Sequence, residues 1–287
     1  MEYFVNSEQK AYDDWQIDLL IESFKRHGID EKLTIACSET NGQRYNELYN
    51  LAFHKNYFLY QSIGMKRGFL NLDQLYSLAW CMQNQKIGSR ICVIKPCVLL
   101  KNKDFDLKIP DVETVSVSID PFFTFDNAKN MTGNFWENST NDKEFYKRNW
   151  IPIGNLIFLN KIPYDFVLRT ITIAENLIVN QIINKIPVWE ETIKLAWVLN
   201  TIDYLGRINI FASYDYTSSM SDFGVNPFID YQSGIPPVFN RSMFTFTPPI
   251  NMAFGDPIEV ISNCKISPNS AYMSELANSL IARRTKS

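Results

Sequence analysis

The residues with the clearest chemical potential lie within one apolar run, 91-ICVIKPCVLLK-101. Apolar runs of this kind are typical of central parallel strands that are covered on both faces. Ligands usually bind at the carboxyl ends of such strands. Lys95 and Cys97 stand at that point. Lys95 can hold a phosphate group as a point charge, or it can be a solvated lysine beside a site that binds nothing.

A pair of carboxylates follows a few residues later. Asp104 and Asp106 form a D-x-D triplet in the polar stretch 102-NKDFDLKIPD-111. Carboxylates at this spacing can share a hard divalent cation such as Mg²⁺ or Mn²⁺. Because such triplets are common by chance in polar sequence, the pair is either a metal site displaced along the chain or an ordinary loop.

Three further carboxylates are candidates for acid–base chemistry. Glu190 and Glu191 follow Pro187 in the first turn of a predicted helix. They either complement the helix dipole or supply a catalytic base on the acceptor side. Asp203 lies near the end of the same helix. It is either a displaced catalytic carboxylate or the partner of Arg207 in a salt bridge between residues four apart.

The segment 120–148 is polar, aromatic and rich in Asn, and it is long for an ordinary connection. Asp120 opens it and Trp136 lies within it, and both are candidates to bind an acceptor. Its aromatic residues suit an exposed recognition surface or a lid that folds over the site. Gly154 and Asn155 begin the next apolar strand. They allow close backbone approach and an amide donor beside a ligand, or they form only a bulge.

The composition excludes several classes of function. A net charge of −3 over 287 residues leaves no basic field for nucleic acid or for an anionic membrane. No apolar stretch reaches the roughly 18–20 residues of a membrane span, and the N-terminus has no signal-peptide pattern. The 5 cysteines and 2 histidines form no zinc pattern. They predict reduced, buried thiols in a reducing compartment.

The elements that must position these residues alternate between strand and helix. Strands at 3–5, 32–38 and 91–100 and helices at 13–27 and 72–85 predict a doubly wound α/β sheet with a mostly parallel order. Further along, we predict an edge strand at 112–119, a buried strand at 150–160 and another strand at 208–213. We also predict helices at 163–183, 188–206 and 269–282. The basic cluster 283-RRTK-286 indicates a solvated tail.

No linker or internal repeat divides the chain. We therefore predict one domain over 1–287, with a nucleotide-binding half at 1–101. An acceptor half and C-terminal loops would occupy 102–287.

Several segments together resemble the hydroxyproline O-arabinosyltransferase and peptidyl-serine galactosyltransferase group. These segments are Tyr12-x-x-Trp15-Gln16, 91-ICVIKPCVLLK-101, 152-PIGNLIFLN-160, 192-TIKLAWVLNTIDYL-205, 214-YDYT-217, 239-FNRSMFTFTPPI-250 and the Leu-Ala helix at 276–281. The resemblance implies a GT-A, Rossmann-like fold with helices on both faces of the sheet and a loop-rich C-terminal part. It also implies a nucleotide-sugar donor, first of all a UDP-sugar, held at the carboxyl ends of the strands.

The sequence departs from that family where the chemistry would lie. Lys95 and Cys97 replace the two carboxylates of the metal motif, which argues against a bound divalent metal there. Asn200 replaces the Glu that follows Trp-Val, and an amide cannot act as a base. Ser213 replaces a His. The resemblance still places Lys95, Cys97, Gly154, Asn155 and Asn200 on the donor side.

Two hypotheses follow from these observations. In the first, the protein transfers a sugar from a nucleotide diphosphate to a protein or glycan acceptor, and in a metal-independent version of this hypothesis Lys95 holds the diphosphate. In the second, a protein with a glycosyltransferase fold has lost catalysis and serves as a binding or structural component of a larger assembly, for instance a virus particle. We expect the protein to be cytoplasmic or associated with a virion. Neither needs a membrane span.

Overall fold

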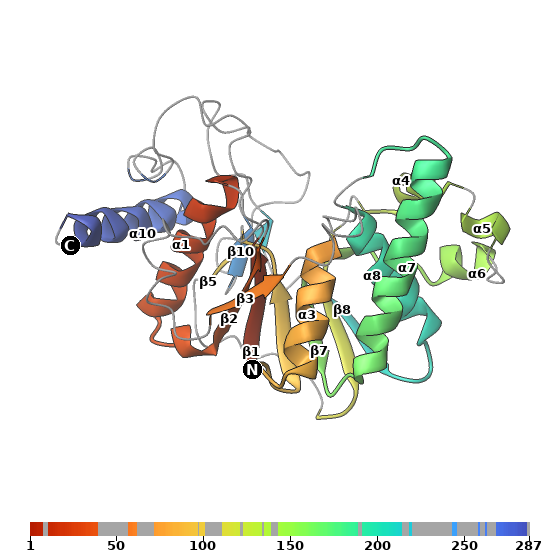
Figure 1. Ribbon diagram of the computed structural model, residues 1–287, viewed down its shortest axis with the longest axis horizontal. Coiled ribbons are helices and arrows are strands. Elements are labelled where there is room, and N and C mark those ends of the chain that lie inside the picture. The colour runs from red at the N-terminus through yellow and green to blue at the C-terminus, as the bar shows by residue number, and fades with distance from the viewer. Residues whose placement is uncertain are drawn as a thin grey trace.

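A seven-stranded sheet in the order β3-β2-β1-β4-β7-β6-β8 forms the centre of the protein, for which we have a computed structural model (Figure 1). The strands are β1 (Glu2–Ser7), β2 (Leu33–Glu39), β3 (Tyr57–Gln61), β4 (Arg90–Ile94), β6 (Thr114–Ile119), β7 (Ile153–Asn160) and β8 (Asn209–Ser213). Strand β7 is antiparallel to both neighbours, and the other pairings are parallel.

The structure describes most of this framework and parts of the remaining chain. The described residues are 1–7, 11–39, 57–61, 72–96, 98–100, 111–120, 123–133, 135–138, 143–188, 191–213, 218–219, 243–245, 258, 262 and 268–285. The predicted α/β class with a mostly parallel sheet is confirmed. The proposed division into halves at residue 101 stays a prediction.

The apolar run at 91–101 is interrupted, and its two parts join different sheets. Strand β4 ends at Ile94, and β5 (Val98–Leu100) pairs with β10 (Met243–Thr245) in a small sheet that also contains β9 (Ser218–Ser219). The backbone N–H of Val98 donates to the carbonyl of Lys95 at 3.0 Å, which turns the chain. Proline at 96 cannot donate a ladder hydrogen bond, so the first strand stops there.

Helices cover both faces of the large sheet. Helices α1 (Ala11–Arg26) and α10 (Pro268–Arg284) lie on one side, and α3 (Asp73–Gln83), α7 (Tyr164–Ile183) and α8 (Glu191–Asp203) on the other (Figure 1). Successive strand residues point to opposite faces. Accordingly Tyr3 and Val5 pack in the core under α1, whereas Phe4 packs in the core under α3.

The expectation of an edge strand at 112–119 is wrong. Strand β6 lies between β7 and β8, and its residues 114–118 are fully buried. Its alternating Ser and Thr residues suggested a solvated face, but small hydroxyl side chains can be buried when they are hydrogen-bonded. Ser118 shows this, because its hydroxyl oxygen accepts the backbone N–H of Leu156 at 3.0 Å.

The segment 120–148 is more ordered than its composition suggests. It contains α4 (Phe125–Ala128), the 3₁₀ turn η4 (Lys129–Met131), α5 (Phe135–Asn138) and α6 (Lys143–Arg148). Phe123, Phe125 and Tyr146 are buried in the core shared with α7 and α8. These aromatic side chains anchor the segment instead of forming an exposed recognition surface.

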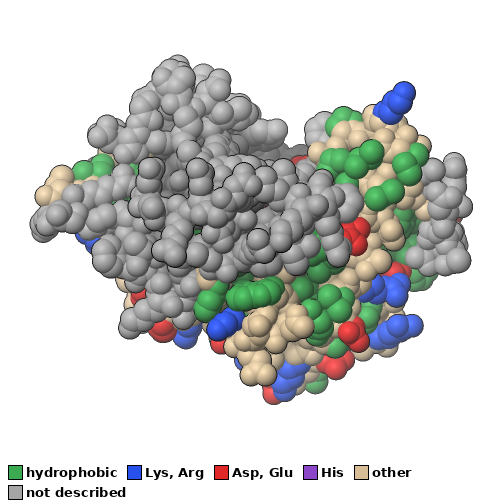
Figure 2. All heavy atoms as spheres, viewed as in Figure 1, with side chains coloured by type: hydrophobic (Ala, Val, Ile, Leu, Met, Phe, Trp, Pro, Cys, Tyr) green, Lys and Arg blue, Asp and Glu red, His purple; other side chains and the backbone are tan. Residues whose placement is uncertain are grey.

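Helix α7 is long and apolar enough to cross a membrane by length and composition alone. It packs against α3 and α8, and eight of its residues are buried, which is typical of a core helix. Its outer side carries exposed hydrophobic residues, including Ile182 and Ile183, which are 58% and 66% exposed, and Figure 2 shows hydrophobic side chains gathered on this side of the molecule.

Helix α10 extends into the basic cluster at 283–286, so the expected tail begins as a helix. Arg283 and Arg284 belong to α10. Arg283 pairs with the buried carboxylate of Glu22 on α1 at 3.0 Å, and the hydroxyl of Ser279 donates to the same carboxylate at 2.8 Å. Arg283 and Ser279 therefore help to fix α10 to α1.

Candidate functional site

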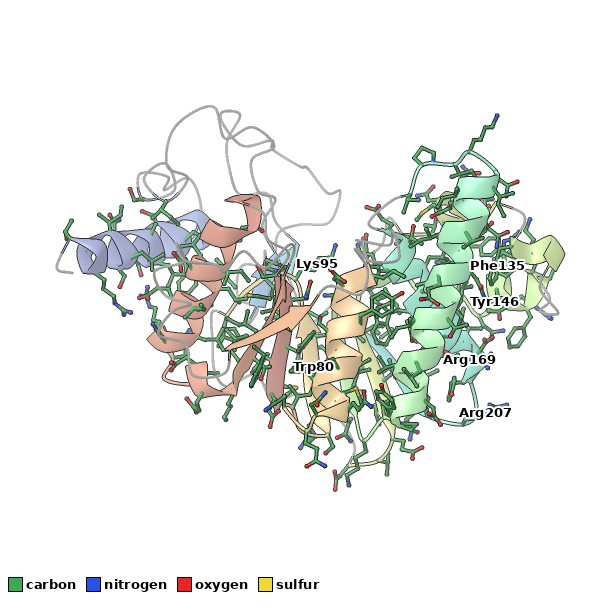
Figure 3. The ribbon with its side chains drawn as sticks, viewed as in Figure 1. Trp80, Lys95, Phe135, Tyr146, Arg169 and Arg207 are labelled. Carbon is green, nitrogen blue, oxygen red and sulfur yellow. The ribbon has the colours of Figure 1, made fainter. Side chains whose placement is uncertain are left out.

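Lys95 and Asp120 lie at the same edge of the sheet. Both follow the carboxyl end of a strand, and β4 and β6 run in the same direction because β7 is antiparallel to each of them. Val93 of β4 and Val117 of β6 pair with the same residue, Ile157 of β7. Two strand spacings separate these strands by about 10 Å. Figure 3 shows Lys95 at that end of the strands.

Lys95 stands at the point where the strand order of the sheet reverses. Strands β2 and β3 extend from one side of β1, and β4 begins the other side. In open α/β sheets this reversal leaves a crevice at the carboxyl edge in which ligands bind. Lys95 is half-buried there. The side-chain amide of Gln74 donates to the carbonyl of Ile94 at 3.4 Å, which fixes the start of α3 beside the crevice.

Asn6 lies near the carboxyl end of β1, at the same edge of the sheet. Its side-chain amide donates to the carbonyl of Ala36 at 3.2 Å and to the hydroxyl of Ser77 at 3.0 Å. These contacts join β1, β2 and α3 at the carboxyl edge.

The described residues at the end of β4 do not fit a divalent metal. Lys95 brings an ammonium and Pro96 offers no side-chain donor, whereas Mg²⁺ and Mn²⁺ require oxygen ligands. Among the described residues, no three His, Cys, Asp or Glu side chains lie together as a metal site would need. Asp104, Asp106 and Cys97 fall outside the described residues, as does Glu190.

Gly154 and Asn155 lie on β7, next to the end of β4. The register of β4 and β7, continued by two residues, brings position 155 opposite Lys95. A Cβ atom at Gly154 would lie 2.6 Å from the hydroxyl oxygen of Ser118 and 3.1 Å from its carbonyl oxygen. The pairing of β6 and β7 also shifts register at this point. Gly154 therefore serves the close contact of two strands, as expected for a bulge.

Asn200 lies in the contact between two helices. Its side chain is fully buried, and its amide nitrogen donates to the carbonyl of Phe166 and the hydroxyl of Thr170, both at 2.8 Å. Both acceptors belong to α7, so the amide joins α8 to α7. This placement gives Asn200 a structural role, and its predicted contact with a donor stays a prediction.

Asp203 pairs with a different arginine from the one its spacing suggested. Its carboxylate binds Arg169 of α7 at 2.6 Å and accepts a hydrogen bond from the hydroxyl of Tyr146 on α6. Figure 3 shows Tyr146 and Arg169 near each other in the part of the molecule that contains α6 and α7. Burial, reinforced by the Asp203 carboxylate, raises the pKa of Tyr146, and the hydrogen bond to Asp203 raises the pKa of Arg169. Arg207 instead lies over the ring of Tyr204.

A pocket of about 600 Å³ opens beside Asp120. Its polar lining consists of Asp120, Asn127, Asn130, Glu191 and Lys194. Two residues predicted for different roles, Asp120 for acceptor binding and Glu191 for catalysis, therefore meet in one cavity. A volume between about 300 and 1,000 Å³ is usual for a small-molecule site.

Lys194 is the best-fixed polar group of the pocket. Its ammonium donates to the carboxylate of Asp120 at 3.1 Å and lies 5.8 Å from the ring centre of Phe123. The Lys194 side chain is 14% exposed and that of Asp120 is 28% exposed, so the pair is shielded from solvent. A cation that is paired with a carboxylate and an aromatic face holds one position.

Trp136 does not line the pocket. Its ring packs against the rings of Phe125, Phe135 and Tyr146, at centroid distances of 6.2, 5.3 and 5.0 Å. Its indole nitrogen is buried without a hydrogen-bond partner within the described part of the chain. Its predicted contact with an acceptor stays a prediction.

The sequence reasoning missed Lys194, Asn127 and Asn130. Lys194 is the sole basic residue of α8, which is otherwise apolar on its buried side. An isolated cation in such a helix is a usable signal for a paired or functional charge. The two asparagines carry no comparable signal, because the whole segment 120–148 is rich in Asn.

Comparison with known proteins gives matches to solved structures only. No family model and no curated protein sequence matches the chain. The galactosyltransferase LgtC, solved with donor and acceptor sugar analogues, superposes with a TM-score of 0.55 at 10% identity, covering 97% of this chain and 96% of that one. An active-site mutant of LgtC gives a TM-score of 0.57 at 10% identity, again covering 97% of this chain and 96% of that one.

A third structure agrees with these two. The bifunctional glycosyltransferase WbbM gives a TM-score of 0.51 at 12% identity, covering 96% of this chain and 49% of that one. Identities this low establish the fold alone. The strand order, the single antiparallel strand and these superpositions together show that the chain has the GT-A glycosyltransferase fold.

Proposed function

We propose that the protein is a metal-independent glycosyltransferase that moves a sugar from a nucleotide-diphosphate donor, a UDP-sugar first of all, to a glycan or protein acceptor. The observation that carries this proposal is the position of Lys95. It places a cation at the carboxyl ends of β1 and β4, at the reversal of strand order where open α/β sheets usually bind ligands.

The proposed reaction asks two things of this edge of the sheet. An acceptor hydroxyl oxygen bonds to the anomeric carbon of the donor sugar, while the bond from that carbon to the diphosphate oxygen breaks and leaves its electron pair on the nucleoside diphosphate. The hydroxyl proton passes to a carboxylate, for which Glu191 is our candidate. Lys95 would stabilise the charge that develops on the leaving diphosphate.

The remaining donor-side residues have supporting roles in this scheme. Position 155 and Gly154 bring the β7 backbone beside Lys95. Asn6 and Gln74 hold β1, β2, β4 and α3 together beside Lys95. Cys37, Cys81 and Cys92 are buried, and Cys81 and Cys92 are free thiols, which supports a reducing compartment such as the cytoplasm.

Nucleotide binding tests the proposal directly. We would measure the thermal stability of the protein with UDP and several UDP-sugars, with Mn²⁺ and with EDTA. A ligand at a hundredfold excess over its Kd stabilises the native state by about 2.7 kcal/mol. We expect UDP or a UDP-sugar to raise the unfolding temperature in the presence of EDTA. Lys95→Ala should weaken the binding of this ligand about tenfold, consistent with the loss of a charged hydrogen bond.

Lys161 provides the matched control. It follows the other end of β7, so it lies at the opposite edge of the sheet, where it pairs with Asp111 at 2.9 Å. Lys161→Gln should leave UDP binding unchanged. A shift that requires Mn²⁺ would point to Asp104 and Asp106 as a metal site and would remove the metal-independent part of the proposal.

A non-catalytic role is the second candidate. Asn200 stands where the family that the sequence resembles carries a Glu. Its side-chain amide is hydrogen-bonded to α7. Such a protein would keep the fold as a binding or structural component of an assembly, for instance a virus particle. The absence of any stabilisation by UDP or UDP-sugars would favour this candidate over the enzyme.

A further inference from the structure

We propose that the pocket beside Asp120 is a binding site for a neutral saccharide, and that it discriminates against anionic ligands. The inference rests on the proposed function in one respect, because it assigns this saccharide as the acceptor. The binding itself does not depend on catalysis. It follows from the charge, the surface chemistry and the location of the pocket.

The charge of the lining decides between neutral and anionic ligands. Asp120, Glu191 and Lys194 together carry a formal charge of −1. The Lys194 ammonium is engaged by Asp120 at 3.1 Å, so it is not available to balance a phosphate or carboxylate of a ligand. The exposed carboxylate of Glu191 has no ion pair within the described part of the chain. A second anion in the pocket would face this like charge in a partly shielded space.

The surface chemistry favours a ring with one apolar face and several hydroxyls. Phe123, Met131, Ile186 and Pro187 supply an apolar wall. Asn127 and Asn130 line the pocket with amide groups that both donate and accept hydrogen bonds, and Glu191 accepts them. A sugar ring satisfies both requirements, since its C–H face packs on apolar side chains and its hydroxyls pair with amides and carboxylates.

The location connects the pocket to the proposed donor site. Asp120 follows β6 at the same edge at which Lys95 follows β4. Asp120 of the pocket and Lys95 therefore lie at one edge of the sheet, with β7 between their strands. A saccharide in the pocket would be on the side from which an acceptor could approach a donor sugar.

Ligand-observed NMR in the absence of nucleotide tests the inference. We would record saturation-transfer difference spectra of the protein with lactose, maltose and the methyl glycosides of glucose, galactose and mannose. Sialyllactose and glucose 6-phosphate serve as anionic comparison ligands. We expect saturation transfer to at least one neutral sugar, and about tenfold weaker binding of its anionic counterpart.

Matched variants locate the site. Asn130→Trp in η4 should fill the pocket and abolish the saturation transfer. Asn176 is also an exposed asparagine but lies on α7, so Asn176→Trp should leave the saturation transfer unchanged. Glu191→Gln should reduce the discrimination against the anionic sugars. Its control is Glu144→Gln, because Glu144 is also an exposed glutamate in the first turn of a helix but lies outside the pocket.

The outcomes separate this inference from the proposed function. Saccharide binding that Asn130→Trp removes supports the pocket even if UDP does not bind, and the protein would then be a saccharide-binding module. The inference is overturned if no neutral sugar shows saturation transfer, if Asn130→Trp leaves the transfer intact, or if anionic sugars bind as well as neutral ones. Binding of UDP together with any of those results would leave the enzyme proposal standing without this acceptor site.

Discussion

The side-chain amide of Asn200 donates a hydrogen bond of 2.8 Å to the hydroxyl oxygen of Thr170, and this contact ties α8 to α7. The sequence resemblance places Asn200 at a catalytic position on the donor side. In the structure, this side chain is fully buried between two helices that cover the sheet. The packing role and the donor-side role predict different effects for the same variant, so the two can be separated by experiment.

We therefore expect Asn200→Ala to reduce stability and leave nucleotide affinity unchanged. Loss of the buried amide should lower the free energy of unfolding by about 1–3 kcal/mol. Urea denaturation gives the stability, and calorimetric titration with UDP gives the affinity. The control is Asn176→Ala on the exposed side of α7, which should change stability by less than about 0.5 kcal/mol. Weakened UDP binding at unchanged stability would return Asn200 to the donor site.

Asp203 should contribute to stability because its carboxylate accepts the hydrogen bond of the Tyr146 hydroxyl. Asp203→Ala removes the acceptor of a buried phenol and should lower the free energy of unfolding by about 1–3 kcal/mol. Arg169 is half-exposed, so Arg169→Ala should cost about 0–1 kcal/mol. A double-mutant cycle of Asp203→Ala with Tyr146→Phe should show coupling, and a cycle with Arg207→Ala should show none. Strong coupling to Arg207 instead would contradict the observed pairing.

Gly154→Ala should be destabilising because the new methyl group meets β6. The nearest atoms are the hydroxyl and carbonyl oxygens of Ser118, at 2.6 and 3.1 Å. Overpacking of this kind costs about 1–3 kcal/mol, measured as the loss in the free energy of unfolding in urea. Gly88→Ala is the control, since its nearest contact is the flexible side chain of Glu2 at 3.0 Å.

A second variant checks the cause. The cost of Gly154→Ala should fall when Ser118→Ala removes the hydroxyl, although the carbonyl contact remains. An equal cost in both backgrounds would place the strain elsewhere.

Alkaline pH should weaken the fold through the buried thiol of Cys81. Burial raises the pKa of Cys81 to about 12 from 9.0. The folded protein thus keeps a proton that the unfolded chain loses, so this stabilisation is complete below pH 9.0 and falls as the pH rises towards about 12. The urea midpoint of the unmodified protein should decrease as the pH rises from about 8 to about 10. The urea midpoint of Cys81→Ala should decrease less steeply over the same range. Equal slopes would contradict this role for Cys81.

Much of the framework is predictable because it depends on short-range pattern. The apolar periodicity and the acidic and basic ends of the helix at 13–27 anticipate α1, and the apolar runs anticipate β1, β2 and β7. The prediction that β6 lies at the sheet edge is wrong. Alternating Ser and Val residues occur both in strands with one solvated face and in buried strands whose hydroxyls are hydrogen-bonded, so the pattern does not distinguish the two.

The candidate site was only partly predictable. Asp120 and Glu191 were singled out separately, yet nothing in their sequence positions indicates that they share a pocket. Lys194 joins Asp120 across 74 residues. Such a contact depends on how α8 packs on the sheet.

Residue types and local spacing were enough to predict the α/β class, the succession of strands and helices along the chain, and the cation at the end of β4. The partners of the polar groups, in contrast, followed from the tertiary structure. The packing of the elements pairs Asp203 with Arg169 instead of Arg207 and buries Asn200 against α7. It also brings Asp120, which follows β6, together with residues of α4 and α8 in the pocket. This is because periodicity constrains which face of an element is buried, whereas the partner across that face depends on the packing of whole elements against one another.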